Sequence, residues 1–221
     1  MLIYLIKGGP LMIAIGLCSI AAGALAIVQW LRLLEMSDHT SKHVVEIAQA
    51  VQKRDWASAV QISDQYDHPF LKPWRAGFIL LIEGKSDLRD IEETVSIEGT
   101  KMIAQLESAL RQLGALTAIL PMLGFLGTIL GLIISFEAWE QMGAQVSISA
   151  LAGGIYQAMI TTAAGLIAAI PYNMLYHYFT AQAQKVALEF SKETTQLFRL
   201  VKDTLLRETP VGPDPVLSTT P

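Results

Sequence analysis

The sequence predicts an all-α integral membrane protein with three transmembrane helices, two of them extended into the cytoplasm as long helices. The first observation is composition, because 52% of the 221 residues are hydrophobic and the mean hydropathy is +0.42. The second is that three apolar stretches each have the length needed to cross a bilayer core, about 20 residues. The third is that two of these stretches continue into amphipathic helical patterns.

The first span is predicted over residues 11–34, after an outer N-terminal segment of residues 1–10 that ends in Gly8-Gly9-Pro10. A cleaved signal peptide is the alternative, because Ala22-Gly23-Ala24 resembles a cleavage site. A signal peptide carries its positive charge before the apolar core, whereas only Lys7 precedes this one. We therefore expect an uncleaved membrane anchor.

Residues 35–112 are predicted to form a mostly helical cytoplasmic loop. Apolar residues at helical spacing indicate two short helices: Val44, Ile47, Ala48 and Val51, then Trp56, Ala59, Val60 and Ile62. The apolar stretch 70–82 is expected to pack on the bundle or on the inner leaflet. A new helix then begins near Ser86 or Asp87, with acidic residues in its first turn.

The second span, residues 113–139, is predicted to be the end of that same helix. The apolar stripe runs from Ile91 to Leu113 without a strong turn signal, so one helix of about 50 residues is expected. An outer hairpin of residues 140–148 leads to the third span, residues 149–179.

The third span is expected to continue as an amphipathic cytoplasmic helix over residues 180–208, and the proline-rich tail 209–221 is expected to be disordered. The apolar stripes of these two long helices must be buried against other apolar surfaces. Contacts with other copies of the chain in an oligomer are one way to bury them. The alternative is that the stripes cover each other and the loop helices.

The basic residues predict the orientation. Ten of the 16 Lys and Arg residues lie between Arg32 and Arg111, and five lie between Lys185 and Arg207. The hairpin contains none. By the positive-inside rule, the loop and the C-terminus are cytoplasmic, while the N-terminus and the hairpin face outward.

The second and third spans are rich in small residues, which allow helix backbones to approach closely. The residues predicted to serve helix packing are Gly124, Gly127, Gly131, Gly154, Ala158 and Gly165, together with Pro121 and Pro171. Polar residues threaded among them face protein or water rather than lipid, so they are candidates for function. The other interpretation of these polar residues is that they make interhelical hydrogen bonds.

Two motifs carry a family resemblance. The first is Pro121 followed by Gly124-Phe125-Leu126-Gly127-Thr128 and Gly131, and the second runs from Gly154-Ile155 through Thr162-Ala163 and Gly165-Leu166 to Ala168-Ala169-Ile170-Pro171 and Tyr176. With the three-span layout, these motifs resemble the ExbB/TolQ group of the MotA/TolQ/ExbB proton-channel family.

The resemblance implies a subunit of an ion-driven, proton-powered motor in the bacterial inner membrane. It implies a homo-oligomer, typically a pentamer, around two copies of an ExbD/TolR-like one-span partner whose membrane aspartate carries the ion. A TonB/TolA-like or other envelope-spanning effector would receive the force. The runner-up hypothesis is a non-conducting oligomeric membrane scaffold.

The residues predicted to line the ion path are Thr162, Gln157, Thr161 and Thr128. The resemblance implies this role for Thr162 and for the position of Gln157, and Thr161 lies four residues after Gln157 on the helix. Two departures from the family pattern bear on this site. Gln157 stands where the family usually has a glutamate, and Ile119 stands where it has a second-span threonine. Thr117 lies nearby but is not at the equivalent position.

Other functional classes find little support in the sequence. No phosphate loop, nucleophile motif or paired-carboxylate site stands out, so an enzyme and a cofactor are not expected, and no basic stripe indicates nucleic acid. His39 and His43 have the spacing of metal ligands on one helix face, but no third ligand accompanies them, so solvated surface is the expectation. Glu137 and Glu140 are expected to form a solvated rim, a cation funnel being the alternative.

Overall fold

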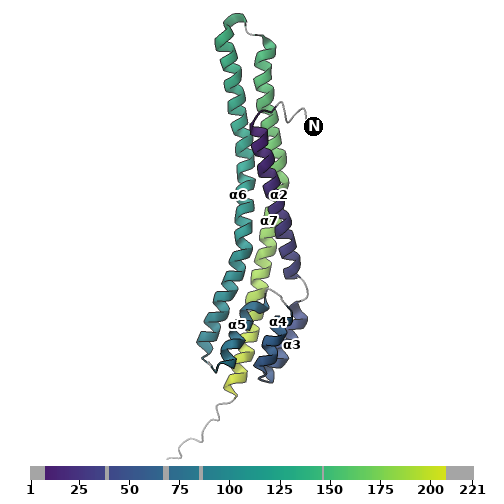
Figure 1. Cartoon of the computed structure of the whole chain (residues 1–221), viewed down its shortest axis with the longest axis vertical. Helices are drawn as coiled ribbons and strands as arrows, with labels where there is room; N and C mark the ends of the chain where they lie inside the picture. Colours follow the sequence, from purple (N-terminus) through teal and green to yellow (C-terminus); the bar gives the residue numbers. More distant parts are fainter. Residues whose placement is uncertain (1–7, 38–39, 67–69, 85–86, 146, 208–221) are drawn as a thin grey trace, which may run out of the picture. The chain divides into compact units, whose positions relative to one another are not determined.

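The structure is a computed structural model that describes residues 8–37, 40–66, 70–84, 87–145 and 147–207 (Figure 1). Every regular element in these ranges is helical: α2 (Leu11–Ser37), α3 (Thr40–Gln52), α4 (Trp56–Gln65), α5 (Leu71–Ile82), α6 (Leu88–Met142), the short 3₁₀ turn η1 (Gly143–Gln145) and α7 (Ile148–Leu206). The all-α class predicted from the sequence is therefore confirmed.

Two continuous helices dominate the chain. α6 has 55 residues and α7 has 59, each with a proline in its interior, Pro121 and Pro171. Both confirm the long helices expected from uninterrupted apolar stripes. Where the sequence predicted a hairpin over residues 140–148, α6 continues to Met142 and Gly143 makes the turn with a φ of 54°.

The chain divides into two compact units. The first unit comprises Met1–Leu33 and Gln105–Ala183, and the second comprises Leu34–Ala104 and Gln184–Pro221. In the first unit, α2 runs beside α6 and α7 (Figure 1). Met12 and Ile15 of α2 form one buried apolar cluster with Leu120 and Ala169. α2, α6 and α7 are each long and apolar enough to cross a membrane, as the sequence predicted.

The second unit has its own apolar core, built from five helices. The buried residues come from α3, α4 and α5 and from the parts of α6 and α7 in this unit: Ile47, Ala50, Val51, Ala59, Leu71, Trp74, Phe78, Leu81, Ile91, Val95, Leu197 and Val201. In the second unit, the apolar stripes of α6 and α7 are therefore covered by packing within one chain. The apolar segment 70–82 packs on the helices, which confirms the first of its two predicted locations.

Local polar contacts fix the ends of the short helices. α4 begins after Asp55, whose carboxylate accepts hydrogen bonds from the Ser58 amide at 3.0 Å and from the Ser58 hydroxyl at 2.6 Å. These bonds lower the pKa of Asp55. Arg54 turns the chain between α3 and α4 with a φ of 59°, and its guanidinium donates to the Thr204 carbonyl in the last turns of α7.

Gln29 is a polar residue on the buried face of α2. It is 1% exposed, and among the described residues neither its amide nitrogen nor its amide oxygen has a hydrogen-bond partner. An unpaired buried amide costs roughly 1–3 kcal/mol, while an apolar side chain of similar shape does not carry that cost. We therefore expect Gln29→Met to raise the thermal unfolding temperature of the purified protein in detergent.

The control for this prediction is Gln157→Met, since Gln157 is only partly buried in the same unit. Its unfolding temperature should change less than that of Gln29→Met. A fall in the unfolding temperature of Gln29→Met would mean that the amide makes favourable hydrogen bonds in the folded protein.

Candidate functional site

Small residues bring the backbones of α6 and α7 close together in the first unit. This small-residue interface consists of Gly124, Gly127 and Gly131 on α6 and Gly154, Ala158 and Gly165 on α7. All six residues are buried. A methyl group added at Gly131 would lie 2.6 Å from the Gly154 carbonyl oxygen, and one at Gly165 would lie 2.7 Å from the Leu120 carbonyl oxygen. The backbones thus approach so closely that only glycine fits at these positions.

The structure uses these small residues inside one chain. Gly131 lies against Gly154 and Ala158, and Gly165 lies against Leu120 and Gly124, so these contacts join α6 to α7 of the same molecule. The two prolines predicted to serve packing differ from them, since Pro121 is half-buried and Pro171 is exposed.

Hydroxyl groups add polar links across the same interface. The Thr162 hydroxyl donates to the Gly124 carbonyl oxygen at 2.9 Å, and the Ser135 hydroxyl donates to the Leu151 carbonyl oxygen at 3.1 Å. Ser135 was missed in the sequence analysis, although it lies four residues after Gly131 and eight after Gly127 on the same helix face. That spacing is the signal that could have identified it.

Thr161 requires a correction. It was expected among the residues that line an ion path, but it is fully buried and lies against Gly127. Its hydroxyl donates within α7, to the carbonyl oxygens of Gln157 at 3.1 Å and Ala158 at 2.9 Å. Because Thr161 has no exposed surface in the single chain, its side chain is not available to line a passage between helices.

Gln157 and Thr162 lie on opposite sides of the small-residue interface. The Gln157 amide lies against Gly9, just before α2 begins. Ile160 and Ala164, which pack in the cluster that joins α2 to α7, lie on that same side. Thr162 is five residues after Gln157, about 140° further round the helix at 3.6 residues per turn. The structure therefore does not bring these two predicted residues together.

Thr128 and Thr162 do lie on the same side, away from α2. On α6, Leu120 and Leu123 contact the α2 cluster, and Thr128 lies about 80° and 140° round the helix from them. Its hydroxyl donates to the Phe125 carbonyl oxygen at 2.6 Å. Both threonines are partly exposed. We call this pair the polar edge.

The remaining polar candidates are more dispersed. Ile119, at the position of the family threonine, is 42% exposed. Thr117 is 4% exposed, and its hydroxyl donates to the Gly114 carbonyl oxygen at 2.8 Å. Thr117 therefore does not replace the family threonine. Glu137 and Glu140 are exposed at the end of α6. The side chains of His39 and His43 lie outside the described residues, and in the described part of the chain no group of three potential metal ligands gathers.

Comparison with known proteins identifies the family. The model of the MotA/TolQ/ExbB proton channel family matches residues 63–192, which is more than half of the chain. A putative biopolymer transport protein ExbB homolog from Methanothermobacter thermautotrophicus is 30% identical over 162 residues, covering 72% of this chain and 54% of the relative.

Two further relatives come from bacteria. Biopolymer transport protein exbB1 of Vibrio cholerae is 37% identical over 98 residues, covering 44% of this chain and 43% of the relative. Tol-Pal system protein TolQ of Pseudomonas aeruginosa is 23% identical over 189 residues, covering 78% of this chain and 80% of the relative. The chain thus spans about half the length of the first two relatives. It belongs to the MotA/TolQ/ExbB proton channel family, in the branch that resembles ExbB and TolQ.

Proposed function

We propose that this protein is the channel-forming stator subunit of an ion-driven motor in the bacterial inner membrane. Several copies, five in the arrangement typical of the family, would surround two copies of an ExbD/TolR-like one-span partner. Ion flow, with the proton as the favoured ion, would drive movement that the partner or a TonB/TolA-like effector transmits across the envelope. Membrane lipid would cover the outward apolar surface.

The polar edge is the observation that carries this proposal. Thr128 and Thr162 are partly exposed on the side of α6 and α7 that α2 leaves uncovered. A threonine hydroxyl donates and accepts hydrogen bonds but does not titrate near neutral pH, so it can hold water without storing the proton. The carrier would then be the partner's aspartate.

The test is to purify the protein with its one-span partner, reconstitute the complex in vesicles, and measure proton and sodium uptake under an imposed gradient. The control complex carries Asp→Asn in the partner's span. Uptake that depends on this aspartate supports the motor. If the complex forms but transports neither ion, the proposal is wrong.

A non-conducting oligomeric scaffold is the second candidate. Two observations favour it: the amide of Gln157 cannot replace a titrating carboxylate, and the exposed Ile119 places an aliphatic side chain where the family has a threonine. A neighbouring gene for a one-span protein with an aspartate in its span would favour the motor over the scaffold.

The topology proposed with this function has the N-terminus outside and the C-terminus in the cytoplasm. Gln141 and Gln61 are both exposed in the chain, so each can be replaced by cysteine in a Cys18→Ser background. An impermeant maleimide should label Gln141→Cys in intact spheroplasts and Gln61→Cys only after permeabilisation. The reverse pattern would invalidate the positive-inside argument and the orientation of the proposed motor.

A further inference from the structure

We propose that the hydrocarbon core of the bilayer covers the first unit between the levels of Tyr156 and Tyr178 on α7, so that the tip of the α6–α7 hairpin around Gly143 projects beyond the outer lipid surface. The partner of the covered surface is the acyl chains of phospholipids. This inference rests on the membrane location and orientation proposed above and is independent of ion conduction.

One side of α7 presents an exposed apolar stripe with a tyrosine at each end. Tyr156 and Tyr178 are 42% and 48% exposed. The 22 residues that separate them place the two tyrosines about 40° apart round the helix and about 33 Å apart along it. The exposed residues between them on this side are all apolar: Ala163, Ile167, Ile170, Pro171 and Met174. A hydrocarbon core is about 30 Å thick, and tyrosines gather at its two interfaces, so the stripe has the length and the ends of a lipid-facing surface.

Polar residues lie on other sides of α7. Thr162 and Asn173 lie about 140° and 120° round the helix from Ile167, which is in the middle of the stripe. The Gln157 amide lies against Gly9 at the start of α2. Polar side chains within a membrane face protein or water, so their positions leave the apolar stripe as the side of α7 that faces lipid.

All three helices of the first unit mark the inner level. Trp30 of α2 stacks on Tyr178, with the ring centroids 6.3 Å apart. On α6, Gly114 lies against the Tyr176 ring. Arg111 is exposed three residues nearer the start of α6, which places it at nearly the same level as Tyr178 because α6 and α7 are antiparallel. Aromatic and basic side chains at one level are typical of the cytoplasmic interface.

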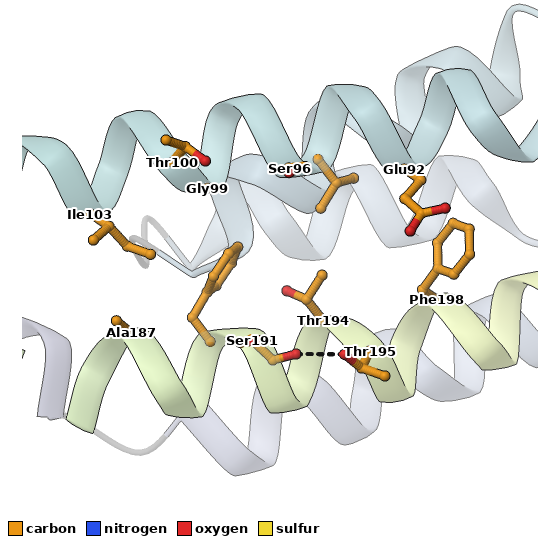
Figure 2. Close-up of a pocket in the computed structure, with 12 residues that line it drawn as sticks. Glu92, Ser96, Gly99, Thr100, Ile103, Ala187, Ser191, Thr194, Thr195 and Phe198 are labelled. Atoms are coloured by element: carbon orange, nitrogen blue, oxygen red, sulfur yellow. Dashed lines mark hydrogen bonds between the residues drawn. The ribbon is translucent and has the colours of Figure 1, made fainter. Parts of the chain in front are cut away.

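Beyond the inner level, α6 and α7 become polar. Figure 2 shows a groove of about 330 Å³ between the parts of these helices that belong to the second unit. Glu92 and five hydroxyl side chains line it: Ser96, Thr100, Ser191, Thr194 and Thr195. Such a lining suits water rather than acyl chains, so the hydrocarbon core ends before these residues.

Contacts beside Tyr156 mark the outer level. Gly9, just before α2, lies against Gln157, and Gly131 of α6 lies against Ala158. α2 therefore begins near the level of Tyr156, as expected of a helix that crosses only the hydrocarbon core, and α6 passes this level near Gly131.

The hairpin continues well past the outer level (Figure 1). Met142, the last residue of α6, lies 11 residues and about 16 Å beyond Gly131. The interfacial layer on each side of a bilayer is only about 5–8 Å thick, so the tip extends past it. Glu137 and Glu140 are exposed about 9 and 14 Å beyond Gly131, where water can solvate their carboxylates. A bilayer that covered the tip would place both carboxylates in or beside hydrocarbon, which is strongly unfavourable.

Nitroxide labels test this placement of the bilayer. Single-cysteine variants in a Cys18→Ser background are labelled and reconstituted in vesicles of phosphatidylethanolamine and phosphatidylglycerol. The collision rate of each label with oxygen, which concentrates in hydrocarbon, is compared with its collision rate with a water-soluble nickel chelate. Ile167→Cys lies midway between the two tyrosines, so its ratio of oxygen to nickel collisions should be the highest. It should be several-fold above the ratio for Gln141→Cys at the hairpin tip.

Ala163→Cys is the matched control, because Ala163 is exposed on the same stripe one turn nearer the hairpin. Its ratio should lie below that of Ile167→Cys. A higher ratio at Ala163→Cys would overturn the proposal, because the bilayer would then be centred on the whole apolar run of α7 and would cover the tip. Rare collisions of the Ile167→Cys label with both reagents would overturn it too, because another protein chain would then cover the stripe. Neither outcome depends on ion uptake, so the proposed motor is tested separately.

Discussion

Thr162→Val is expected to abolish ion uptake by the reconstituted complex while the complex still assembles. Valine has nearly the shape of threonine but lacks the hydroxyl, so the change removes one polar group from the polar edge. A narrow passage that loses its hydrogen-bonding group no longer holds water. The hydroxyl also donates to the Gly124 carbonyl oxygen, and losing an interhelical hydrogen bond of this kind costs about 0.6 kcal/mol, too little to separate α6 from α7.

The neighbouring threonine supplies a matched control for this prediction. Thr161→Val makes the same chemical change one residue earlier, at a buried position whose hydroxyl donates only within α7. Uptake by the Thr161→Val complex should remain near the wild-type rate. Gln157→Glu, which restores the residue usual in the family, should also be tolerated. Wild-type uptake by Thr162→Val would exclude Thr162 from the ion path.

The sequence predicted the helical architecture well because the relevant signals are local. Apolar stripes without turn residues gave the continuous α6 and α7, and the length of each apolar stretch gave the three candidate spans. The glycine spacing correctly indicated close helix packing. It could not say whether the partner helix belongs to the same chain, because small residues serve both kinds of contact equally well.

The candidate site was harder to predict because it depends on which side of α7 faces α2. Thr161 and Thr162 are adjacent in sequence, yet one is fully buried against Gly127 and the other lies at the polar edge. A rotation of 100° per residue separates them, and periodicity alone does not fix which direction is covered. The positions of Gln157 beside Gly9 and of Thr128 opposite α2 follow from the packing of α2, which no local motif encodes.

Gly154→Ala is expected to destabilise the first unit, while Gly153→Ala, one residue earlier, is expected to stabilise it slightly. A methyl group at Gly154 would overlap the Ser135 hydroxyl and the Gly131 carbonyl oxygen and would lie 3.1 Å from the Ser135 amide nitrogen. Backbone atoms cannot move aside cheaply, so α6 and α7 must separate. Overpacking of this kind costs about 1–3 kcal/mol.

The adjacent glycine isolates the steric effect from helix propensity. Gly153 is exposed, and a methyl group there would meet no atom of the described part of the chain within 4 Å. Both variants gain the same helix propensity, about 1 kcal/mol in favour of alanine, so the difference between them measures the close approach of α6 and α7. Thermal unfolding in detergent should place Gly154→Ala below the wild type and Gly153→Ala at or above it, and Gly154→Leu should lower the unfolding temperature further. Equal unfolding temperatures for the two alanine variants would mean that α6 and α7 do not touch at Gly154, and the small-residue interface would then have to be sought between chains.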